Sequence, residues 1–326
     1  MPLYNKAPYV RKAVESVVGQ TYSNWELVVV DDCSTDGSGD IVASFTDSRI
    51  RLVRLDENGG VGGARNKGVE LSGMGDLKAT SQNEGGSTTT APYICFLDAD
   101  DWWQPTFLEE MAGLIERHPD AGIYGTGYYI VKNGKKRIAP IGVDKGFTEG
   151  DINYCQVYAK TLCMPLWTGA VCMPRKIFNE AGGFPINIKL GEDFLLWIHV
   201  ALKHKVVLLN MPLSNYNQDV SSAFRGTHNK RYNPDTFMTF HFDQFKEEEE
   251  TNNDLKLLLD RIRVYTLMNF RQHNLYPDRV WQEIAKVDFS NVKPIYRFYY
   301  QAPFWIVRIF CTTRILLSKI KQTLKR

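Results

Sequence analysis

Short apolar runs alternate with helically spaced apolar residues along the first 130 positions of this chain. The runs have the length of strands buried on both faces, and the segments between them repeat apolar residues every three or four positions. Strands are predicted at residues 3–4, 25–30, 50–55, 93–97 and 121–131. Helices are predicted at residues 7–18, 39–45 and 105–118, and at 65–71 after a glycine-rich turn over 59–64. This alternation is typical of an α/β domain built on a parallel sheet.

The pattern is less regular further along the chain. Residues 72–91 are rich in glycine, serine, threonine and asparagine, which predicts a flexible surface loop, whereas residues 132–160 show no regular spacing. Further elements are predicted as a strand at 166–173, helices at 174–181 and 194–203, and a strand at 206–210. Beyond residue 233 the spacing is helical, with helices at 235–245, 255–272 and 278–287. The acidic segment at 247–250 is predicted as a turn or as the solvated face or junction of a helix.

We therefore expect an α/β fold with a mostly parallel central sheet flanked by helices, followed by a helical C-terminal extension. The predicted boundaries are a main domain over residues 1–230, a helical extension over 231–302 and a basic amphipathic tail over 303–326. The main domain is expected to divide into two halves, at about residues 1–130 and 131–230.

Charge is distributed unevenly between this tail and the rest of the chain. The whole chain has a formal net charge of +2, but residues 303–326 hold six Lys/Arg and no Asp/Glu, which leaves 33 basic and 37 acidic residues elsewhere. Tryptophan, phenylalanine and isoleucine alternate with these charges, as is typical of a helix lying on an anionic membrane surface. The alternative is a helix packed on the protein itself, with a basic outer edge.

Composition excludes several classes of protein. With 44% hydrophobic and 23% charged residues the chain is globular rather than disordered, and its small net charge gives no reason to expect nucleic acid as a partner. The six cysteines lack the spacing of zinc ligands, and their scatter argues against a disulfide framework. No signal peptide and no apolar run of about 20 residues is seen, so we expect a cytoplasmic protein, peripheral at the inner face of the cell membrane.

The apolar segment at residues 93–97 stops at three carboxylates within residues 98–101. Because strand side chains alternate in direction, we expect Asp98 and Asp100 to leave the strand on the same side. Two carboxylates so placed are costly unless a cation lies between them, and Mg²⁺ or Mn²⁺ holding phosphate oxygens would satisfy both. The alternative is that Asp101 caps the following helix and the other two are solvated loop acids.

Two more polar clusters follow predicted strands, where ligands of open parallel sheets bind. Asp31 and Asp32 end the strand at 25–30, and an Asp there can accept two donors from a nucleobase edge or ribose hydroxyls. Helix capping by residues 34–36 is the alternative, although it leaves the two Asp residues unexplained. The glycine-rich stretch before Arg65 fails the dinucleotide-binding spacing, but glycines allow close approach of a ligand and Arg65 could neutralise a phosphate.

A series of motifs runs along the first third of the chain: Pro2-Leu3-Tyr4-Asn5, Ala13-Val14-Glu15-Ser16-Val17, Gln20-Thr21-Tyr22, Trp25-Glu26-Leu27-Val28-Val29-Val30-Asp31-Asp32, Ser34-Thr35-Asp36-Gly37-Ser38, Ala64-Arg65-Asn66-Lys67-Gly68 and Phe96-Leu97-Asp98-Ala99-Asp100-Asp101. In order and spacing, apart from one insertion, these motifs resemble family 2 of the inverting glycosyltransferases, and the resemblance covers about residues 1–220. The resemblance implies the α/β fold that binds nucleotide diphosphate sugars, a donor of that class, expected to be a UDP-sugar, and Mn²⁺ or Mg²⁺ as cofactor.

The resemblance also implies roles for individual residues. Asp32 would contact the nucleobase. Asp98 and Asp100 would bind the ribose and the metal ion, and Asp100 is the expected metal ligand. A polar segment at residues 216–228 matches the part of the family that closes over the diphosphate. Donor binding as a whole is implied for Pro2, Tyr4, Asp32, Arg65, Asp98 and Asp100.

A further resemblance covers the segments around residues 167–170 and 182–185, which precede Gly191-Glu192-Asp193. It implies that Asp193 is the general base. Inverting transfer requires a base because the acceptor hydroxyl must lose its proton on the face opposite the leaving group. A carboxylate that opens a helix would be kept charged by the helix N–H groups. The alternative is that Asp193 is only an N-cap.

Some family features differ in this sequence. Members usually have more apolar residues before the Pro2-Leu3-Tyr4-Asn5 motif, so a short first strand is expected, and the Gln-x-x-Arg-Trp motif of processive synthases is absent. We therefore predict an inverting, metal-dependent hexosyltransferase that adds one sugar to a hydroxyl acceptor, by analogy a lipid-linked saccharide of surface polysaccharide synthesis. The alternatives are a nucleotidyl- or phosphotransferase using the same acidic strand ends, and a membrane-associated binding module with a relict site.

Overall fold

The computed structural model describes residues 1–73, 92–221, 233–303 and 305–307. It forms two compact units, Met1–Arg231 and Tyr232–Arg326. The predicted surface loop lies outside the described residues from 74 to 91, and the tail lies outside them beyond residue 307. Residues 222–232, which include most of the segment expected to close over the diphosphate, are also outside them.

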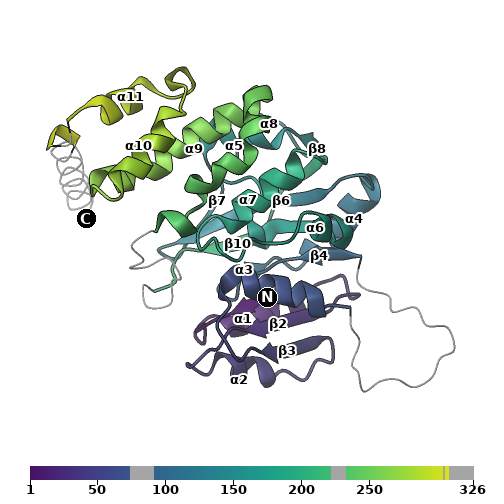
Figure 1. Ribbon diagram of the computed structural model, residues 1–326. Coiled ribbons are helices and arrows are strands. Elements are labelled where there is room, and N and C mark those ends of the chain that lie inside the picture. The colour runs from purple at the N-terminus through teal and green to yellow at the C-terminus, as the bar shows by residue number, and fades with distance from the viewer. Residues whose placement is uncertain (74–91, 222–232, 304, 308–326) are drawn as a thin grey trace. The chain divides into compact units, whose positions relative to one another are not determined.

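A three-stranded parallel sheet begins the first unit (Figure 1). In the described part of the chain its strands are, in order, β1 (Pro2–Leu3), β2 (Leu27–Asp31) and β3 (Ile50–Arg54). Its helices are α1 (Val10–Val18), α2 (Ser38–Ala43) and α3 (Gly60–Leu71). The predicted glycine-rich turn at 59–64 is wrong, because α3 already begins at Gly60.

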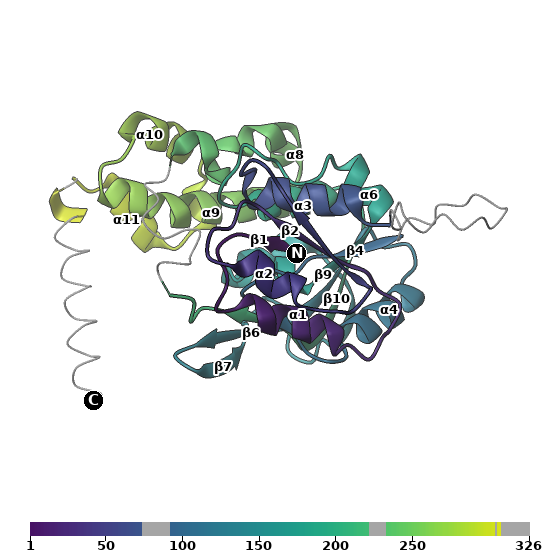
Figure 2. The ribbon, with the colours of Figure 1, turned by 90° about the horizontal axis from the view of Figure 1, so that it is seen from below.

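Strand β2 is buried on both faces. Leu27 and Val29 belong to the core cluster that contains residues of α1 and α2, whereas Val28 and Val30 pack with Ala64 of α3. Figure 2 shows α1 and α3 on opposite sides of β1 and β2. Burial on both faces is the reason for the uninterrupted apolar run in this strand, and it is typical of parallel sheets covered by helices.

A larger, mixed sheet completes the first unit. In the described residues its path is β4-β9-β6-β10-β5, with β7 paired to β6 and β8 paired to β10. Strands β6 and β10 run parallel, and the other pairs are antiparallel. The strands are β4 (Tyr93–Cys95), β5 (Trp102–Trp103), β6 (Ile123–Lys132), β7 (Lys135–Ile138), β8 (Glu149–Ile152), β9 (Val171–Pro174) and β10 (Val206–Asn217). The predicted α/β class with a parallel sheet is confirmed, and parallel pairing is concentrated in β1–β3 and between β6 and β10.

The helices of this part include α4 (Phe107–Arg117), α5 (Tyr154–Thr161), α6 (Arg175–Glu180) and α7 (Glu192–Ala201), and a 3-10 turn, η1 (Thr168–Ala170), precedes β9. The prediction of an irregular segment at 132–160 is wrong, because β7, β8 and α5 lie there. Strands β6 and β7 form a hairpin through Asn133 and Gly134, whose φ angles are +52° and +67°. Asn-Gly is a strong signal for such a two-residue turn, because both positions need positive φ.

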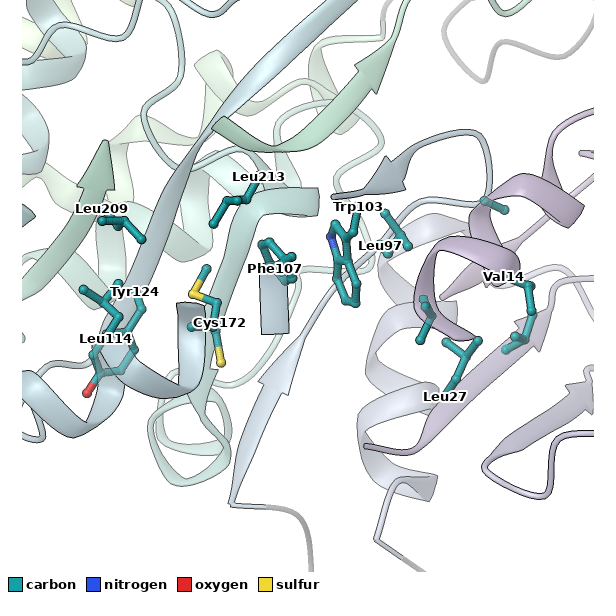
Figure 3. Packing of buried hydrophobic residues seen from close by; sticks show 14 of the residues in the cluster. Val14, Leu27, Leu97, Trp103, Phe107, Leu114, Tyr124, Cys172, Leu209 and Leu213 are labelled. Atoms are coloured by element: carbon teal, nitrogen blue, oxygen red, sulfur yellow. The ribbon is translucent and has the colours of Figure 1, made fainter. Parts of the chain in front are cut away.

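The core cluster of the first unit includes residues from both sheets. It contains Leu27 of β2 together with Leu97, Trp103 and Phe107 from the segments that follow β4. The rings of Trp103 and Phe107 stack with centroids 4.2 Å apart, and the Trp103 indole N–H donates to the Gly169 carbonyl oxygen (2.7 Å). In Figure 3, Trp103 and Leu97 lie between Phe107 and Leu27. The turn that carries the predicted metal ligands is therefore held between two buried segments.

The second unit is helical in the residues that are described, which confirms the predicted helical C-terminal region. Its elements are η3 (Pro234–Thr236), η4 (Met238–Phe245), α8 (Lys246–Thr251), α9 (Asn253–Gln272), α10 (Pro277–Ala285), η5 (Phe289–Asn291) and α11 (Pro294–Gln301). The acidic residues 247–250 lie in helix α8 rather than in a turn. The buried Arg263 of α9 donates to Glu249 of α8 (2.5 and 2.8 Å) and to Glu283 of α10 (3.3 Å). No helix in the described ranges has the length and apolarity needed to cross a membrane.

Candidate active site

The loops that follow β1 and β2 are joined by hydrogen bonds. The backbone N–H of Asn5 donates to the Ser34 hydroxyl (3.0 Å), and that of Lys6 donates to the Ser38 hydroxyl (2.7 Å). Ser34 therefore supports the neighbouring loop rather than capping α2. The loop after β1 also holds Tyr4, whose side chain is 51% exposed. Tyr4 thus presents an aromatic ring to solvent from an ordered loop at the carboxyl end of the parallel strands.

Asp32 is buried directly after β2. Its two carboxylate oxygens accept backbone N–H groups at the start of α3, from Gly59 (2.7 Å) and Gly60 (2.9 Å). Burial raises the pKa of Asp32, and these two hydrogen bonds oppose that rise. Asp32 therefore caps the N-terminus of α3, the helix that follows β3. Its predicted contact with a nucleobase stays a prediction, as does the donor role of Pro2, which pairs with Val30 in the sheet.

The three carboxylates of residues 98–101 lie on a turn. Strand β4 ends before this turn, so the prediction that strand alternation orients Asp98 and Asp100 is wrong. Asp98 and Asp100 instead each have a cation from a distant segment: Asp98 accepts from Arg65 (2.8 Å), and Asp100 pairs with the ammonium group of Lys6. Burial raises the pKa of Asp100, and the Lys6 charge opposes this.

Asp101 is the most deeply buried carboxylate of this turn, with 2% exposure. Its oxygens accept the backbone N–H of Asn217 (2.8 Å) and the indole N–H of Trp167 (3.2 Å). Burial, followed by the neighbouring carboxylates, raises its pKa well above the ordinary value. The N-cap of α4 is Thr106, so the alternative in which Asp101 caps that helix is wrong. Asp101 fixes the turn to the end of β10.

Arg65 joins the turn at residues 98–101, hereafter the acidic turn, to the start of α7. Its side chain is 4% exposed, and its two terminal nitrogens donate to Asp98 (2.8 Å) and to Glu192 (2.9 Å). Burial works to lower the pKa of Arg65, but the charges of these two carboxylates outweigh it and raise the pKa above the ordinary value. The guanidinium carbon also lies 5.0 Å from the centre of the Phe184 ring. This geometry brings together Arg65 and Asp98, two predicted donor residues, and the helix that carries the predicted base.

Asp193 lies in the first turn of α7 and is half-buried. One carboxylate oxygen accepts the Thr168 hydroxyl (2.7 Å), and the other accepts the backbone N–H of Phe194 (2.8 Å). The N-cap of α7 is Gly191, whose φ of +87° is a conformation that glycine adopts readily. The alternative in which Asp193 is only the N-cap is therefore wrong, and its predicted role as base stays a prediction.

Sequence reasoning gave no role to two residues of this site. Glu192 is 7% exposed, and burial followed by the Asp193 charge raises its pKa to about 7. Lys6 pairs with Asp100 from the loop after β1. The signal for Lys6 was its position directly after the Pro2-Leu3-Tyr4-Asn5 motif, and the signal for Glu192 was its position before Asp193.

A cavity of about 250 Å³ opens beside Asp100. It lies between the first residues of α1, the acidic turn, and the ends of β6 and β10. Trp102 and Tyr9 contribute aromatic rings to its wall, and Lys12 contributes a cation. The complete lining is Pro8, Tyr9, Lys12, Asp100, Asp101, Trp102, Val131, Asn217 and Asp219.

The carboxylates of the acidic turn suit a hard divalent ion. Within the described residues no group of three or more His, Cys, Asp or Glu side chains is arranged to hold a metal. Such a group is not needed for Mg²⁺, which often binds one or two carboxylates together with water and substrate phosphates. Asp100 and the neighbouring Asp98 provide such ligands, and Asp100 already binds a cation, the Lys6 ammonium. The residues present therefore fit an ion that binds together with a phosphate ligand.

Comparison with known proteins identifies the family. The family described as "Glycosyl transferase family 2" matches residues 1–73 and 75–169, more than half of the chain. The chain belongs to glycosyl transferase family 2, as the sequence resemblance indicated.

Relatives differ in how much of their length this chain spans. Escherichia coli WfgD, named as a UDP-Glc:alpha-D-GlcNAc-diphosphoundecaprenol beta-1,3-glucosyltransferase, is 28% identical over 64% of this chain and 71% of its own length. The succinoglycan biosynthesis protein ExoO of Rhizobium meliloti is 38% identical over 36% of this chain and 28% of its own length. The TuaG protein of Bacillus subtilis is 35% identical over 40% of this chain. The match spans less than half of TuaG and of ExoO, at 45% and 28% of their lengths.

A solved structure confirms the fold. The structure of S. aureus TarS 1-349 in complex with UDP-GlcNAc superposes with a TM-score of 0.67 at 20% sequence identity. The superposition covers 89% of this chain and 81% of the TarS chain.

Proposed function

We propose that this chain transfers one sugar, with inversion, from a UDP-sugar to a hydroxyl group of a saccharide acceptor, with Asp193 as the general base. The placement of Asp193 carries the proposal. The Thr168 hydroxyl and the start of α7 hold its carboxylate, and its neighbour Glu192 is linked through Arg65 to Asp98 of the acidic turn. The proposed general base, Asp193, and the predicted donor-binding residues Arg65 and Asp98 thus belong to one connected site.

The proposed reaction forms a bond between the acceptor oxygen and the anomeric carbon and breaks the bond from that carbon to the diphosphate. The leaving nucleoside diphosphate keeps the electron pair of the broken bond, and the acceptor proton passes to Asp193. Inversion requires base and leaving group to lie on opposite faces of the sugar. Asp193 lies on α7, whereas Asp100 lies on the turn after β4. Their position on separate elements supports an arrangement with the general base and the leaving group on opposite faces of the sugar.

The donor in this proposal is a UDP-sugar. Tyr4, from its exposed position, would contact the nucleobase of the donor together with Pro2 and Asp32. Arg65 and Asp98 would lie near the ribose and the diphosphate. The UDP-GlcNAc complex of TarS and the UDP-Glc donor in the name of WfgD support this class of donor.

Asp100, with Asp98 beside it, would hold Mg²⁺ or Mn²⁺. Such an ion, when bound, offsets the negative charge that develops on the departing diphosphate. Lys6 neutralises the Asp100 carboxylate when no ion is bound. Asp101 keeps its two hydrogen bonds to neighbouring segments and would hold the turn in place rather than bind the ion.

The acceptor in this proposal is a lipid-linked saccharide of a polysaccharide pathway, reached at the membrane surface. The acceptor in the name of WfgD and the pathway in the name of ExoO support this class. The anionic membrane would bind residues 303–326. The second unit exposes Ile295 and Phe298, by 49% and 56%, shortly before residue 303 in the sequence, and Trp305, by 63%, at the start of the basic segment. Exposed aromatic and aliphatic side chains beside cations suit a surface that lies on lipid.

Product analysis tests the proposed function. The purified chain is incubated with UDP-Glc, UDP-GlcNAc and UDP-Gal in separate reactions with Mn²⁺ and an undecaprenyl diphosphate saccharide, and Asp193→Asn is the control. Release of UDP by the wild type, with little release by the variant, is the expected result. Release of pyrophosphate would indicate nucleotidyl transfer, and no release would indicate a binding module; either outcome overturns the proposal.

A further inference from the structure

Two lysines beside the cavity have aromatic rather than acidic neighbours. Lys12 on α1 lies in the cavity wall, with its ammonium nitrogen 3.1 Å from the centre of the Trp102 ring. Lys136 on β7 has its ammonium nitrogen 4.1 Å from the centre of the Tyr129 ring. Among the residues that the structure describes, neither lysine forms an ion pair with an Asp or Glu.

Strand pairing places Lys136 on the cavity side of the hairpin. Lys136 lies opposite Val131 in the β6–β7 register, and Val131 lines the cavity. Tyr129 is two residues before Val131 and therefore projects from the same face of β6. Burial, followed by the Lys136 charge, lowers the pKa of Lys12, as expected of two ammonium groups that lie near each other.

The carboxylates in the same wall already have other partners. Asp219 accepts the backbone N–H groups of the hairpin turn at Asn133 (2.5 Å) and Gly134 (2.9 Å). Asp101 accepts two N–H groups, and Asp100 pairs with Lys6. These acids hold the cavity wall together, and none of them pairs with the two lysines.

The hairpin adds further positive charge at the rim. Residues 121–143 contain no acidic residue, and their four cations are Lys132, Lys135, Lys136 and Arg137. All four are exposed. This cluster of positive charge on the hairpin raises the local concentration of an anionic ligand beside the cavity.

We propose that Lys12 and Lys136 bind a phosphate group of the acceptor in this cavity, beside the site of the donor diphosphate. The inference rests on the proposed function, which supplies an acceptor, and it assigns to that acceptor a phosphate or diphosphate ester. Two ammonium groups with no acidic partner among the described residues repel each other, and a phosphate between them offsets both charges through charge-assisted hydrogen bonds. In the absence of the phosphate, the Trp102 and Tyr129 rings hold the two cations by cation–π contact.

Calorimetry on the full chain, with UDP and Mg²⁺ at saturation so that the donor site is filled, tests the subsite. Farnesyl diphosphate is the probe for a lipid diphosphate, and glucose 1-phosphate is the probe for a phosphorylated saccharide. Lys12→Met and Lys136→Met should each weaken binding of the preferred probe about tenfold or more, as expected for loss of one charge-assisted contact. The Kd for UDP should stay within about twofold in both variants.

Two variants serve as matched controls. Lys136→Arg retains the charge and should retain binding of the probe, and Lys176→Met removes an 83% exposed lysine of α6 and should change neither Kd. Lys136 is on an exposed strand, so Lys136→Met tests the proposal even if Lys12→Met is poorly folded.

Two results would overturn the subsite. One is that the wild type binds neither probe while UDP is bound. The other is that both lysine variants lose as much affinity for UDP as for the probe, which would place these lysines at the donor diphosphate. The UDP-release assay reports separately on the proposed function: lysine-dependent binding of a probe without any UDP release supports the phosphate subsite and overturns glycosyl transfer.

Discussion

The guanidinium of Arg65 and the carboxylate of Asp98 form an ion pair with a nitrogen–oxygen distance of 2.8 Å. Arg65 lies on α3 and Asp98 on the turn after β4, so the pair connects the parallel sheet to the acidic turn. A second nitrogen of the same guanidinium bonds Glu192, at 2.9 Å. Because the Arg65 side chain is 4% exposed, both carboxylates depend on a cation that water screens poorly.

Arg65→Met should therefore lower the free energy of unfolding by about 3–5 kcal/mol, the usual effect of removing one partner from a buried ion pair. The variant leaves the carboxylates of Asp98 and Glu192 without their cation. Equilibrium urea denaturation measures the change. Arg65→Lys, which keeps the charge but loses the paired geometry, should have a smaller effect. A loss below about 1 kcal/mol in Arg65→Met would show that the pair behaves like an exposed one.

Asp193→Asn should reduce transfer by about 10²–10⁴-fold, which is the usual contribution of general base catalysis. The affinity for UDP should stay nearly unchanged, because the base contacts the acceptor. Single-turnover kinetics and calorimetry measure the two quantities. Thr168→Val, which removes the hydroxyl bonded to Asp193, should reduce transfer by about tenfold. An equal loss of UDP affinity in Asp193→Asn would place Asp193 in the donor site.

Asp100→Ala should abolish the dependence of UDP affinity on Mn²⁺, because the proposed protein ligand of the ion is removed. Calorimetric titration of UDP with and without Mn²⁺ gives the measurement. Asp144→Ala, which removes an 86% exposed carboxylate, is the control and should keep the wild-type dependence. Unchanged Mn²⁺ dependence in Asp100→Ala would contradict the metal assignment.

Glu192 should make stability depend on pH between about 4.5 and 7. Burial raises its pKa from 4.5 to about 7 in the folded protein. Within this window the folded carboxyl keeps a proton that the unfolded chain has released, so stability falls as pH rises and levels off above the folded pKa. The full change is about 3 kcal/mol for a shift of this size.

Glu192→Gln tests the pH dependence, because the amide has no proton to release in this range. The difference between unfolding free energies at pH 5 and pH 7.5 should be smaller in the variant than in the wild type. Urea denaturation at both pH values gives the comparison. Parallel pH profiles for the two proteins would show that Glu192 is not the source of the slope.

Removal of residues 303–326 should abolish binding to anionic vesicles and leave UDP binding intact, because the positive charge of the chain is concentrated there. Wild-type binding should also weaken as salt is raised, since charges are screened beyond about 10 Å at 0.1 M. Vesicle co-sedimentation and calorimetry measure the two effects, with zwitterionic vesicles as the control. A large drop in Tm with unchanged sedimentation would instead show a segment packed on the protein.

Local sequence was sufficient for the elements whose pattern reflects burial. Strand β2 was predictable because each of its faces packs on helices, so residues 27–30 are apolar on both faces. The positions of Asp32, Asp98 and Asp100 after strands followed from the same pattern. The β6–β7 hairpin was missed although Asn133-Gly134 signals such a turn, because the exposed residues of β7 show no apolar alternation.

The partners of the site residues depend on how the chain folds in space. Arg65 and Glu192 are 127 positions apart in the sequence, and Lys6 and Asp100 are 94 positions apart. The local sequence around each residue therefore does not specify its partner. They meet because the loop after β1, helix α3, the acidic turn and helix α7 pack around the ends of the sheets. Local sequence determines which segments are buried and which carry charge, whereas tertiary packing determines which charges compensate each other. A buried charge is stable only when the fold supplies its counter-charge, and that choice is made between elements distant in sequence.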